Sequence, residues 1–356
     1  NDVSVNNYPG QLKFMWKRLR NLFSAANDET IARPRRSARS AGPAGSVSVE
    51  SSTRSLGSEQ ISCRYYSLIL GVHSLADAEL NSLESEAAAR LGKLIKSKES
   101  RERMVPRLPA IIPKLMSSLR DDNVSGADLA RQLGKDASLV GEVIRMANSP
   151  YYRTLNKIQS LEQAVLILGR SGIRHLLAGA AFKPILSTRQ GHFTNLASGW
   201  VWRQSEYCAF SAQCLAKNQS IDAFEAYLAG LVRDIGTIIA LKTMDEIEDI
   251  DDAPRSYQFQ RLFSKQSLRL SRLIANEWEF PANVVQAIAD QTTKSDPANM
   301  PTLASVVHAA TLMSQLKILM EEQRVDDDLA RLACCTEGRL SEHCRRCFGE
   351  LQRYAA

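Results

Sequence analysis

LAGLVRDIGTIIAL, residues 228–241, is the stretch from which the predicted fold follows. Apolar residues recur in it, and just before it, with the three- and four-residue spacing of a helix, which predicts one long helix with a single face in a core. Asp234 lies at the edge of that face, where a carboxylate costs free energy unless a partner neutralises it. Gly230, one turn earlier, is expected to leave space above the carboxylate. The stretch therefore predicts a core helix and a candidate site.

Arg233 precedes that carboxylate and decides what the site can hold. A guanidinium has hydrogen-bond donors, no acceptor and a permanent positive charge, so Arg233 cannot be a metal ligand. An ideal helical wheel puts Arg233 about opposite the apolar face. We therefore expect a solvated Arg233 beside Asp234, whereas an Arg233 that turned inward would form an internal salt bridge.

Charge is distributed unevenly along the chain of 356 residues, whose net charge is +6. Residues 13–39 hold eight Lys or Arg and two acids, which accounts for the whole excess. The remainder is close to neutral, so there is no strong case for nucleic acid as a partner. Seven scattered cysteines, no secretory leader and no apolar run long enough to span a bilayer predict a soluble protein of the reducing cytoplasm.

LKFMWKRLRNLF, residues 12–23, predicts a basic amphipathic helix with Trp16 and Phe23 on its apolar face. Such a helix fits an anionic membrane surface or a docking partner, and equally a helix packed on its own domain. Residues 25–60 are rich in Ser, Gly, Pro and Arg, which predicts a disordered tether. Four parts are expected: the basic helix and tether (1–60), a helical lead-in (61–104), the main domain (105–311) and a C-terminal helical extension (312–356).

Helical periodicity continues along the chain and strands are nearly absent, which predicts an all-α fold. The apolar run Tyr65–Leu70 suits a strand or a helix. A helix is expected from about Leu80 to Ile95, with Ser74 or Asp77 as its start. Further helices are expected at Pro109–Leu119, Ser125–Leu133, Leu139–Asn148 and Leu161–Phe182, the last as two helices joined around Gly169 to Gly172.

The two helices around Gly169 also permit a helix-turn-helix interpretation, in which Arg170, Arg174 and His175 would contact DNA. The stretch is apolar on nearly all sides, as a buried helix is. A packing role is therefore favoured.

The C-terminal tail contains one group of residues that could bind a metal. Cys344 and Cys347 have C-x-x-C spacing, and thiolates at that spacing can bind Zn²⁺. Only one such pair is present, and its neighbours follow an amphipathic-helix pattern, so buried structural cysteines are favoured and no metal is predicted. The other members of the group are Cys334, Cys335 and His343.

Four segments resemble, in order and spacing, the HDOD family, the HD-related output domains of bacterial signalling proteins. They are RLPAIIPKLMSSL (107–119), DASLVGEVIRMANSPYY (136–152), SLEQAVLILG (160–169) and YLAGLVRDIG (227–236). The resemblance runs from about Val105 to Thr311. It implies a multi-helix HDOD/HD-like orthogonal bundle and a bacterial signalling role.

The same resemblance carries over the metal-binding positions of HD phosphohydrolases, and this chain departs from nearly all of them. The two His positions fall on Gln204 and Arg233, and the final Asp position falls on Thr311. One carboxylate cannot build a two-metal centre, so hydrolysis is not expected. His308, on an apolar face, is interpreted as a core histidine. The vestigial pocket is expected to comprise Gln204, Arg233, Asp234, Asp290, His308 and Thr311.

The sequence thus predicts a non-catalytic regulatory module that needs no cofactor. It would bind another signalling protein, or a small ligand, in the cytoplasm, and residues 12–23 would direct it to an anionic membrane surface. The alternative is a metal-dependent phosphohydrolase of nucleotides or cyclic dinucleotides, with the unusual ligands Gln204, Asp234, Asp290 and His308.

Overall fold

The structure is a computed structural model. It describes residues 57–108, 112–113, 131, 137–149, 152, 157–217, 219–248, 252–293, 300–326 and 341–354. Within these ranges the regular elements are all helices, apart from one isolated bridge between Ala76 and Ser256. The all-α prediction is confirmed. The predicted helices at 12–23 and 125–133, most of the one at 109–119, and the tether before residue 57 lie outside the described residues.

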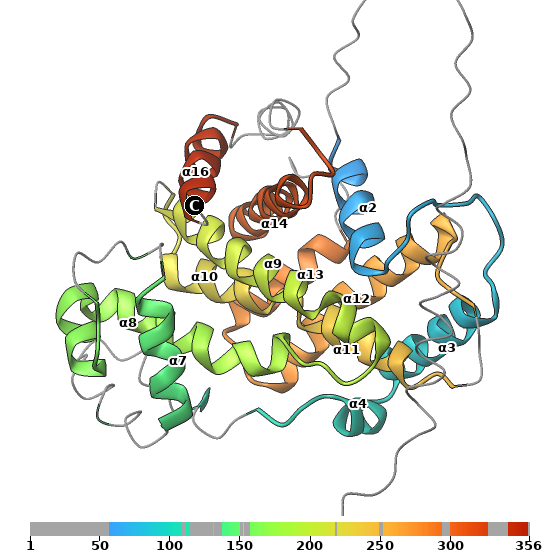
Figure 1. Cartoon of the computed structure of the whole chain (residues 1–356), viewed down its shortest axis with the longest axis horizontal. Helices are drawn as coiled ribbons and strands as arrows, with labels where there is room; N and C mark the ends of the chain where they lie inside the picture. Colours follow the sequence, from blue (N-terminus) through green and yellow to red (C-terminus); the bar gives the residue numbers. More distant parts are fainter. Residues whose placement is uncertain are drawn as a thin grey trace, which may run out of the picture. The chain divides into compact units, whose positions relative to one another are not determined.

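Helix α9 (His192–Ala216) is the helix around which its neighbours pack: α10 (Ala223–Val232), α11 (Ile235–Asp245), α14 (Thr302–Glu321) and α16 (Ser341–Tyr354) all contact it (Figure 1). Gly230 lets α10 approach α9 closely, because a Cβ there would lie 2.7 Å from backbone atoms of Ala209. The expected space above Asp234 is therefore taken by the α9 backbone. Gly236 has the same role on the other side, where a Cβ would overlap the carbonyl oxygen of Ser267.

The described chain begins with α2 (Ser58–Ile69), which packs against α9, α12 (Tyr257–Glu277) and α14. The run Tyr65–Leu70, for which the sequence left strand or helix open, is almost entirely helical. The predicted tether extended too far, because α2 already begins at Ser58. Ile61, Tyr65, Tyr66 and Ile69 are buried, so α2 is part of the core that α9 organises.

Glu84 ties α3 (Ser82–Lys96) to the start of α12. Its Oε2 accepts the Asn81 N–H (3.0 Å) while Asn81 Oδ1 accepts the Glu84 N–H (2.9 Å), a reciprocal capping box. Its Oε1 accepts the N–H groups of Arg255 and Ser256, each at 2.7 Å. Burial opposes ionisation of Glu84, but these donors outweigh it, so its pKa lies below the ordinary value. The helix therefore starts after Asn81, and the predicted starts were wrong. The short helix α4 (Lys98–Met104) follows.

Helices α7 (Ala137–Ala147) and α8 (Leu161–Leu186) form one side of the bundle (Figure 1). The α8 backbone breaks at Gly169, whose φ of 65° is a conformation that glycine adopts readily, so two helical pieces meet there as predicted. Just before the break, Leu166 and Ile167 are 84% and 46% exposed, although the pattern had indicated a fully buried stretch.

The second piece of α8 does not present the residues that a DNA-reading helix would need. His175 is 6% exposed, and burial lowers its pKa to about 4, so it is neutral at pH 7. The Arg174 guanidinium lies 4.6 Å from the centroid of the Phe224 ring. Both side chains face the protein, and the helix-turn-helix alternative is wrong for them.

Helix α13 (Ala282–Thr293) links α12 to α14. Within the described ranges, α14 is the one helix long and apolar enough to cross a membrane by length and composition, although the sequence showed no such run. Of its apolar stretch, 67% is buried inside this protein, as in the core helix of a bundle. The expected domain boundary at residue 311 lies inside this helix.

Candidate functional site

The candidate site is built on a break in the chain between α10 and α11. The sequence had predicted one continuous helix, but α10 ends at Val232 and α11 begins at Ile235, so Arg233 and Asp234 form a turn. A helical wheel does not hold across a turn. Arg233 points inward and is only 9% exposed, so the expectation of a solvated side chain is wrong.

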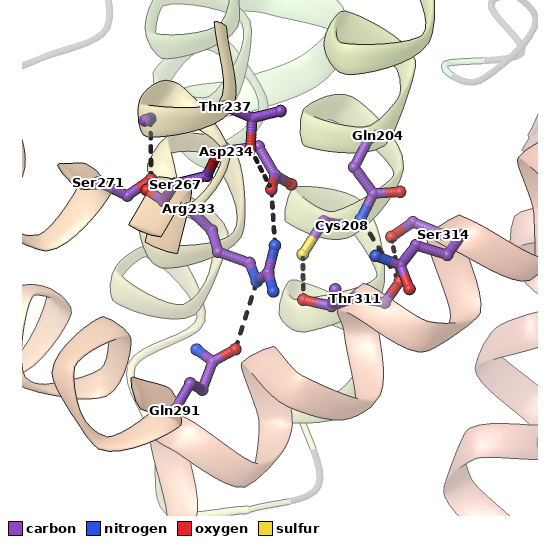
Figure 2. A network of polar contacts seen from close by, with 12 residues as sticks. Gln204, Cys208, Arg233, Asp234, Thr237, Ser267, Ser271, Gln291, Thr311 and Ser314 are labelled. Atoms are coloured by element: carbon purple, nitrogen blue, oxygen red, sulfur yellow. Dashed lines mark hydrogen bonds and ion pairs between the residues drawn. The ribbon is translucent and has the colours of Figure 1, made fainter. Parts of the chain in front are cut away.

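Arg233 and Asp234 form a buried ion pair. Nη1 of Arg233 lies 2.6 Å from Oδ1 of Asp234, and the two side chains are 10% and 2% exposed (Figure 2). Arg233 also donates through Nε to Oε1 of Gln291 on α13 at 3.3 Å. Burial disfavours the charged guanidinium, but the Asp234 carboxylate and the Tyr66 hydroxyl favour it, so the pKa of Arg233 lies above its ordinary value.

A second set of polar contacts joins α9 to α14 beside this pair (Figure 2). Nε2 of Gln204 donates to the carbonyl oxygen of Thr311 at 3.4 Å, and the Thr311 hydroxyl donates to the carbonyl of Val307 at 2.7 Å. Cys208, one turn after Gln204, has its Sγ 3.6 Å from Thr311 Oγ1. Burial raises the pKa of Cys208 to about 12, so the thiol stays protonated and is not a nucleophile.

Several buried polar atoms of this region have no hydrogen-bond partner among the residues that the structure describes. They include Oδ2 of Asp234, Oε1 of Gln204, the Tyr65 hydroxyl and Nε2 of Gln315. Burial, and next the negative charge of Asp234, raise the pKa of Tyr65 well above its ordinary value, so the phenol stays protonated. Buried polar atoms usually have partners, so such atoms are the sites where a small polar species would be accommodated.

Helix α2 covers the site with two adjacent tyrosines. Tyr65 and Tyr66 are 1% and 2% exposed, with ring centroids 5.6 Å apart in an edge-to-face arrangement. The Tyr66 ring also contacts Phe263 of α12, at 6.1 Å between centroids. Sequence reasoning missed this cover, because it treated residues 61–104 only as a lead-in. The signal available was a pair of aromatic residues in an otherwise unassigned apolar run.

The remaining candidate residues lie on α13 and α14. Asp290 is 6% exposed and accepts a hydrogen bond from Nε2 of Gln286 at 3.1 Å, whereas its neighbour Gln291 is the residue that contacts Arg233. His308 is half-buried, one turn before Thr311. The contacts in Figure 2 thus bring Gln204, Arg233, Asp234 and Thr311 together without Asp290 or His308.

The residues present do not fit a metal centre of the HD type. In the described part of the chain, no group of three or more His, Cys, Asp or Glu side chains has the geometry of a cation site. The carboxylate of Asp234 is paired with a guanidinium, which brings its own positive charge and no lone pair. No catalytic step can therefore be derived through a metal at this site.

A model of the HDOD domain matches residues 105–294, more than half of the chain. The chain belongs to the HDOD family. The match begins where the sequence placed the main domain and ends before the expected boundary at 311.

Solved structures share the fold of this chain at low identity. A Shewanella amazonensis SB2B protein, provisionally named a metal-dependent phosphohydrolase, is 19% identical and superposes with a TM-score of 0.52 over 78% of this chain and all of its own. A Marinobacter aquaeolei VT8 protein, provisionally named a signal transduction protein, is 20% identical with a TM-score of 0.50, over 76% of this chain and 64% of its own. An uncharacterised Treponema pallidum (strain Nichols) protein is 20% identical over 57% of this chain, which spans 40% of that protein's length.

The C-x-x-C pair of this HDOD chain, Cys344 and Cys347, is buried, as the amphipathic pattern predicted. Cys347 on α16 forms a disulfide with Cys214 on α9, and the two Cα atoms are 6.0 Å apart. Its sulfur is therefore not available as a thiolate ligand. Cys344 is buried, while Cys334 and Cys335 lie outside the described residues. The sequence could not reveal this pairing, because the partners are 133 residues apart.

Proposed function

We propose that this HDOD chain is a non-catalytic signalling module that acts by binding another signalling protein or a small ligand. The observation that carries the proposal is the 2.6 Å ion pair between Arg233 and Asp234. It occupies the two positions that resemble the His-Asp pair of the HD metal centre, and it neutralises Asp234 without a cation. The module would work in the cytoplasm, with residues 12–23 directing it to anionic membrane surfaces.

The chemistry of the neighbouring groups supports binding over hydrolysis. Hydrolysis of a phosphoester at an HD site needs a cation that lowers the pKa of an attacking water. Gln204 directs its amide N–H at Thr311, and the Thr311 hydroxyl already donates to Val307. The pocket therefore contains one carboxylate whose charge is neutralised and a few weak, uncharged hydrogen-bond donors. Such groups suit a scaffold that is retained for its shape and not for catalysis.

A metal-dependent phosphohydrolase is the second candidate function. Oδ2 of Asp234 and Oε1 of Gln204 accept no hydrogen bond from the described residues, so these two acceptors favour it. The provisional name of the Shewanella relative points the same way. This function would require Asp290 and His308 to join them as ligands, and a cation that tolerates the guanidinium of Arg233.

Metal content and turnover distinguish the two functions. The full chain would be analysed for bound metals, then incubated with Mn²⁺ and either nucleoside phosphates or a cyclic dinucleotide. We expect metal well below one ion per chain, and phosphate release no faster than that of the Asp234→Ala variant. Near-stoichiometric metal together with turnover that Asp234→Ala abolishes would establish the phosphohydrolase instead.

A gain-of-binding variant tests whether the HD positions are aligned correctly. Arg233→His with Gln204→His would put two imidazoles beside Asp234, and we expect measurable Zn²⁺ or Mn²⁺ binding by calorimetry without turnover, because Thr311 still supplies no final carboxylate. The matched control, Arg233→Gln, removes the same charge and adds no imidazole. Equal metal binding by both variants would show that the pocket is not where this alignment puts it.

A further inference from the structure

A groove separate from the Arg233 pocket lies where α3, α12 and α13 meet. Its volume is about 410 Å³, within the range of roughly 300 to 1,000 Å³ that is usual for small-molecule sites. Its walls combine guanidinium, amide, hydroxyl and aliphatic groups. The lining residues are Ile95, Arg269, Arg272, Leu273, Gln286, Ala289 and Thr292.

The groove carries positive charge that no neighbouring acid neutralises. In the parts of the chain that the structure describes, neither Arg269 nor Arg272 has an ion pair or a hydrogen bond. Other arginines near α12 are engaged: Arg261 pairs with Glu59 at 3.2 Å, and Arg101 pairs with Glu277 at 2.6 Å. The two groove arginines therefore keep positive charge that no acid among the described residues neutralises.

The sequence explains why these charges gather there. Four basic residues of α12 follow one another at intervals of four, four and three residues, which puts them on one helical face. No acid occurs in α12 before Glu277 at its end. The near-neutral balance outside residues 13–39 hides this basic face, because the compensating acids lie on other helices. The four residues are Arg261, Lys265, Arg269 and Arg272.

The opposite wall supplies polar and apolar surface. The side chain of Gln286 donates to the buried carboxylate of Asp290 at 3.1 Å, and Thr292 donates to the carbonyl of Ala289 at 2.6 Å. These bonds hold the α13 wall in place. Ile95 and Leu273 add half-buried aliphatic surface. The groove therefore combines two planar guanidinium groups with a neighbouring aliphatic surface that suits a ring or a short chain.

We propose that this groove binds a small phosphate ester, with the phosphate on Arg269 and Arg272 and the organic part against Ile95 and Leu273. A planar guanidinium with several donors matches phosphate oxygens in two-point hydrogen bonds, and a nucleotide-sized molecule fits the volume. Arg261 is already paired with Glu59. Among the described residues, the unpaired charge of this face is therefore limited to Lys265, Arg269 and Arg272, which is too short a run for a long polyanion. The proposal does not depend on the proposed function, because no groove residue takes part in the Arg233 and Asp234 contacts.

Calorimetric titration of the full chain with ADP, inorganic phosphate, adenosine and a single-stranded oligonucleotide tests the proposal. The groove variant is Arg269→Gln with Arg272→Gln, and the matched control is Arg261→Gln with Lys265→Gln, which removes equal charge from the same face outside the groove. We expect adenosine to bind at least about tenfold more weakly than ADP, and the groove variant to lose about tenfold or more in ADP affinity. The control should stay within about twofold.

A second variant guards against loss of the fold in the first. Arg269→Glu changes one exposed lining residue that has no partner among the described residues and puts a negative charge beside Arg272, so ADP affinity should again fall by about tenfold. The proposal is overturned if neither ADP nor inorganic phosphate binds the wild-type chain. It is also overturned if adenosine binds as well as ADP, or if the control weakens ADP or oligonucleotide binding as much as the groove variant does.

Discussion

Arginine has opposite surroundings in two regions of this molecule. Beneath α2, Arg233 is 9% exposed and its charge is neutralised by Asp234. In the groove between α12 and α13, Arg269 and Arg272 face open space and meet no acid among the described residues. A buried charge must be neutralised within the chain, whereas a solvated one can be neutralised by a ligand. Positive charge therefore stabilises the fold in one region of this HDOD chain, and in the other it is left open to solvent and ligands.

The largest effect is expected from removing the cover of the closed region. A chain without residues 1–70 lacks five buried side chains of α2, and each large buried side chain contributes about 2–5 kcal/mol, against a total stability of about 5–15 kcal/mol. We expect no cooperative thermal transition by circular dichroism. The matched control removes only residues 1–52, the first of the two units into which the chain divides, and should melt like the full chain. An unchanged transition without α2 would mean that the Tyr65 and Tyr66 cover is dispensable.

The next largest effect concerns the ion pair itself. Arg233→Ala leaves the Asp234 carboxylate buried and unpaired, which should lower the free energy of unfolding by about 3–5 kcal/mol in urea titrations. Arg203→Ala serves as the control, because Arg203 pairs with Glu321 and Glu322 at a side-chain exposure of 34% and should contribute about 1 kcal/mol or less. Equal losses of unfolding free energy in both variants would mean that the buried Arg233 contributes no more to stability than the more exposed Arg203.

A buried carboxylate, Glu84, is expected to have an intermediate effect. Glu84 is neutralised by backbone N–H donors instead of an arginine, and Glu84→Gln should cost about 1–3 kcal/mol at pH 7. Because the folded-state pKa of Glu84 is lowered, its contribution is present above the unfolded pKa of about 4.3 and is lost as pH falls through the folded pKa. The difference in unfolding free energy between wild type and variant should therefore shrink in acid. Glu86→Gln, at an exposed pair with Arg90, should show a small, flat difference.

The smallest effect is expected in the open region. Arg269→Ala and Arg272→Ala should each change the free energy of unfolding by no more than about 0.5 kcal/mol, because neither side chain has an internal partner to lose. Urea denaturation measures this directly. A loss as large as that of Arg233→Ala would mean that the groove arginines are structural too.

Local pattern and motif order were enough to predict the all-α fold, the break at Gly169 and the HDOD family. Each depends on features that lie close together in sequence: the 3.6-residue period, a glycine that adopts a positive φ, and short motifs in a fixed order. The sequence also showed that Arg233 and Asp234 are adjacent, and it allowed two arrangements for them, a solvated pair or an internal salt bridge.

Features that depend on contacts between distant segments were not predictable. Arg233 turns inward because the chain leaves the helix after Val232, and a wheel assumes that the helix continues. The tyrosines of α2 reach the pocket only after that helix has packed against three others. That the groove arginines have no acidic partner among the described residues can be recognised only from the three-dimensional positions of the acidic residues around them. In each case, tertiary packing decided what periodicity left open.

The disulfide between Cys214 and Cys347 closes a loop over a separation of 133 residues, which includes α10 through α14. Cross-linking a chain over such a span removes many conformations from its unfolded ensemble, worth roughly 5 kcal/mol in the loop-entropy account. The folded bundle need not change for this to matter. In an oxidising environment α16 is covalently joined to α9, whereas in a reducing one it is held by non-covalent contacts alone. The rate at which α16 unfolds and is cleaved by a protease should therefore depend on the redox state of its surroundings.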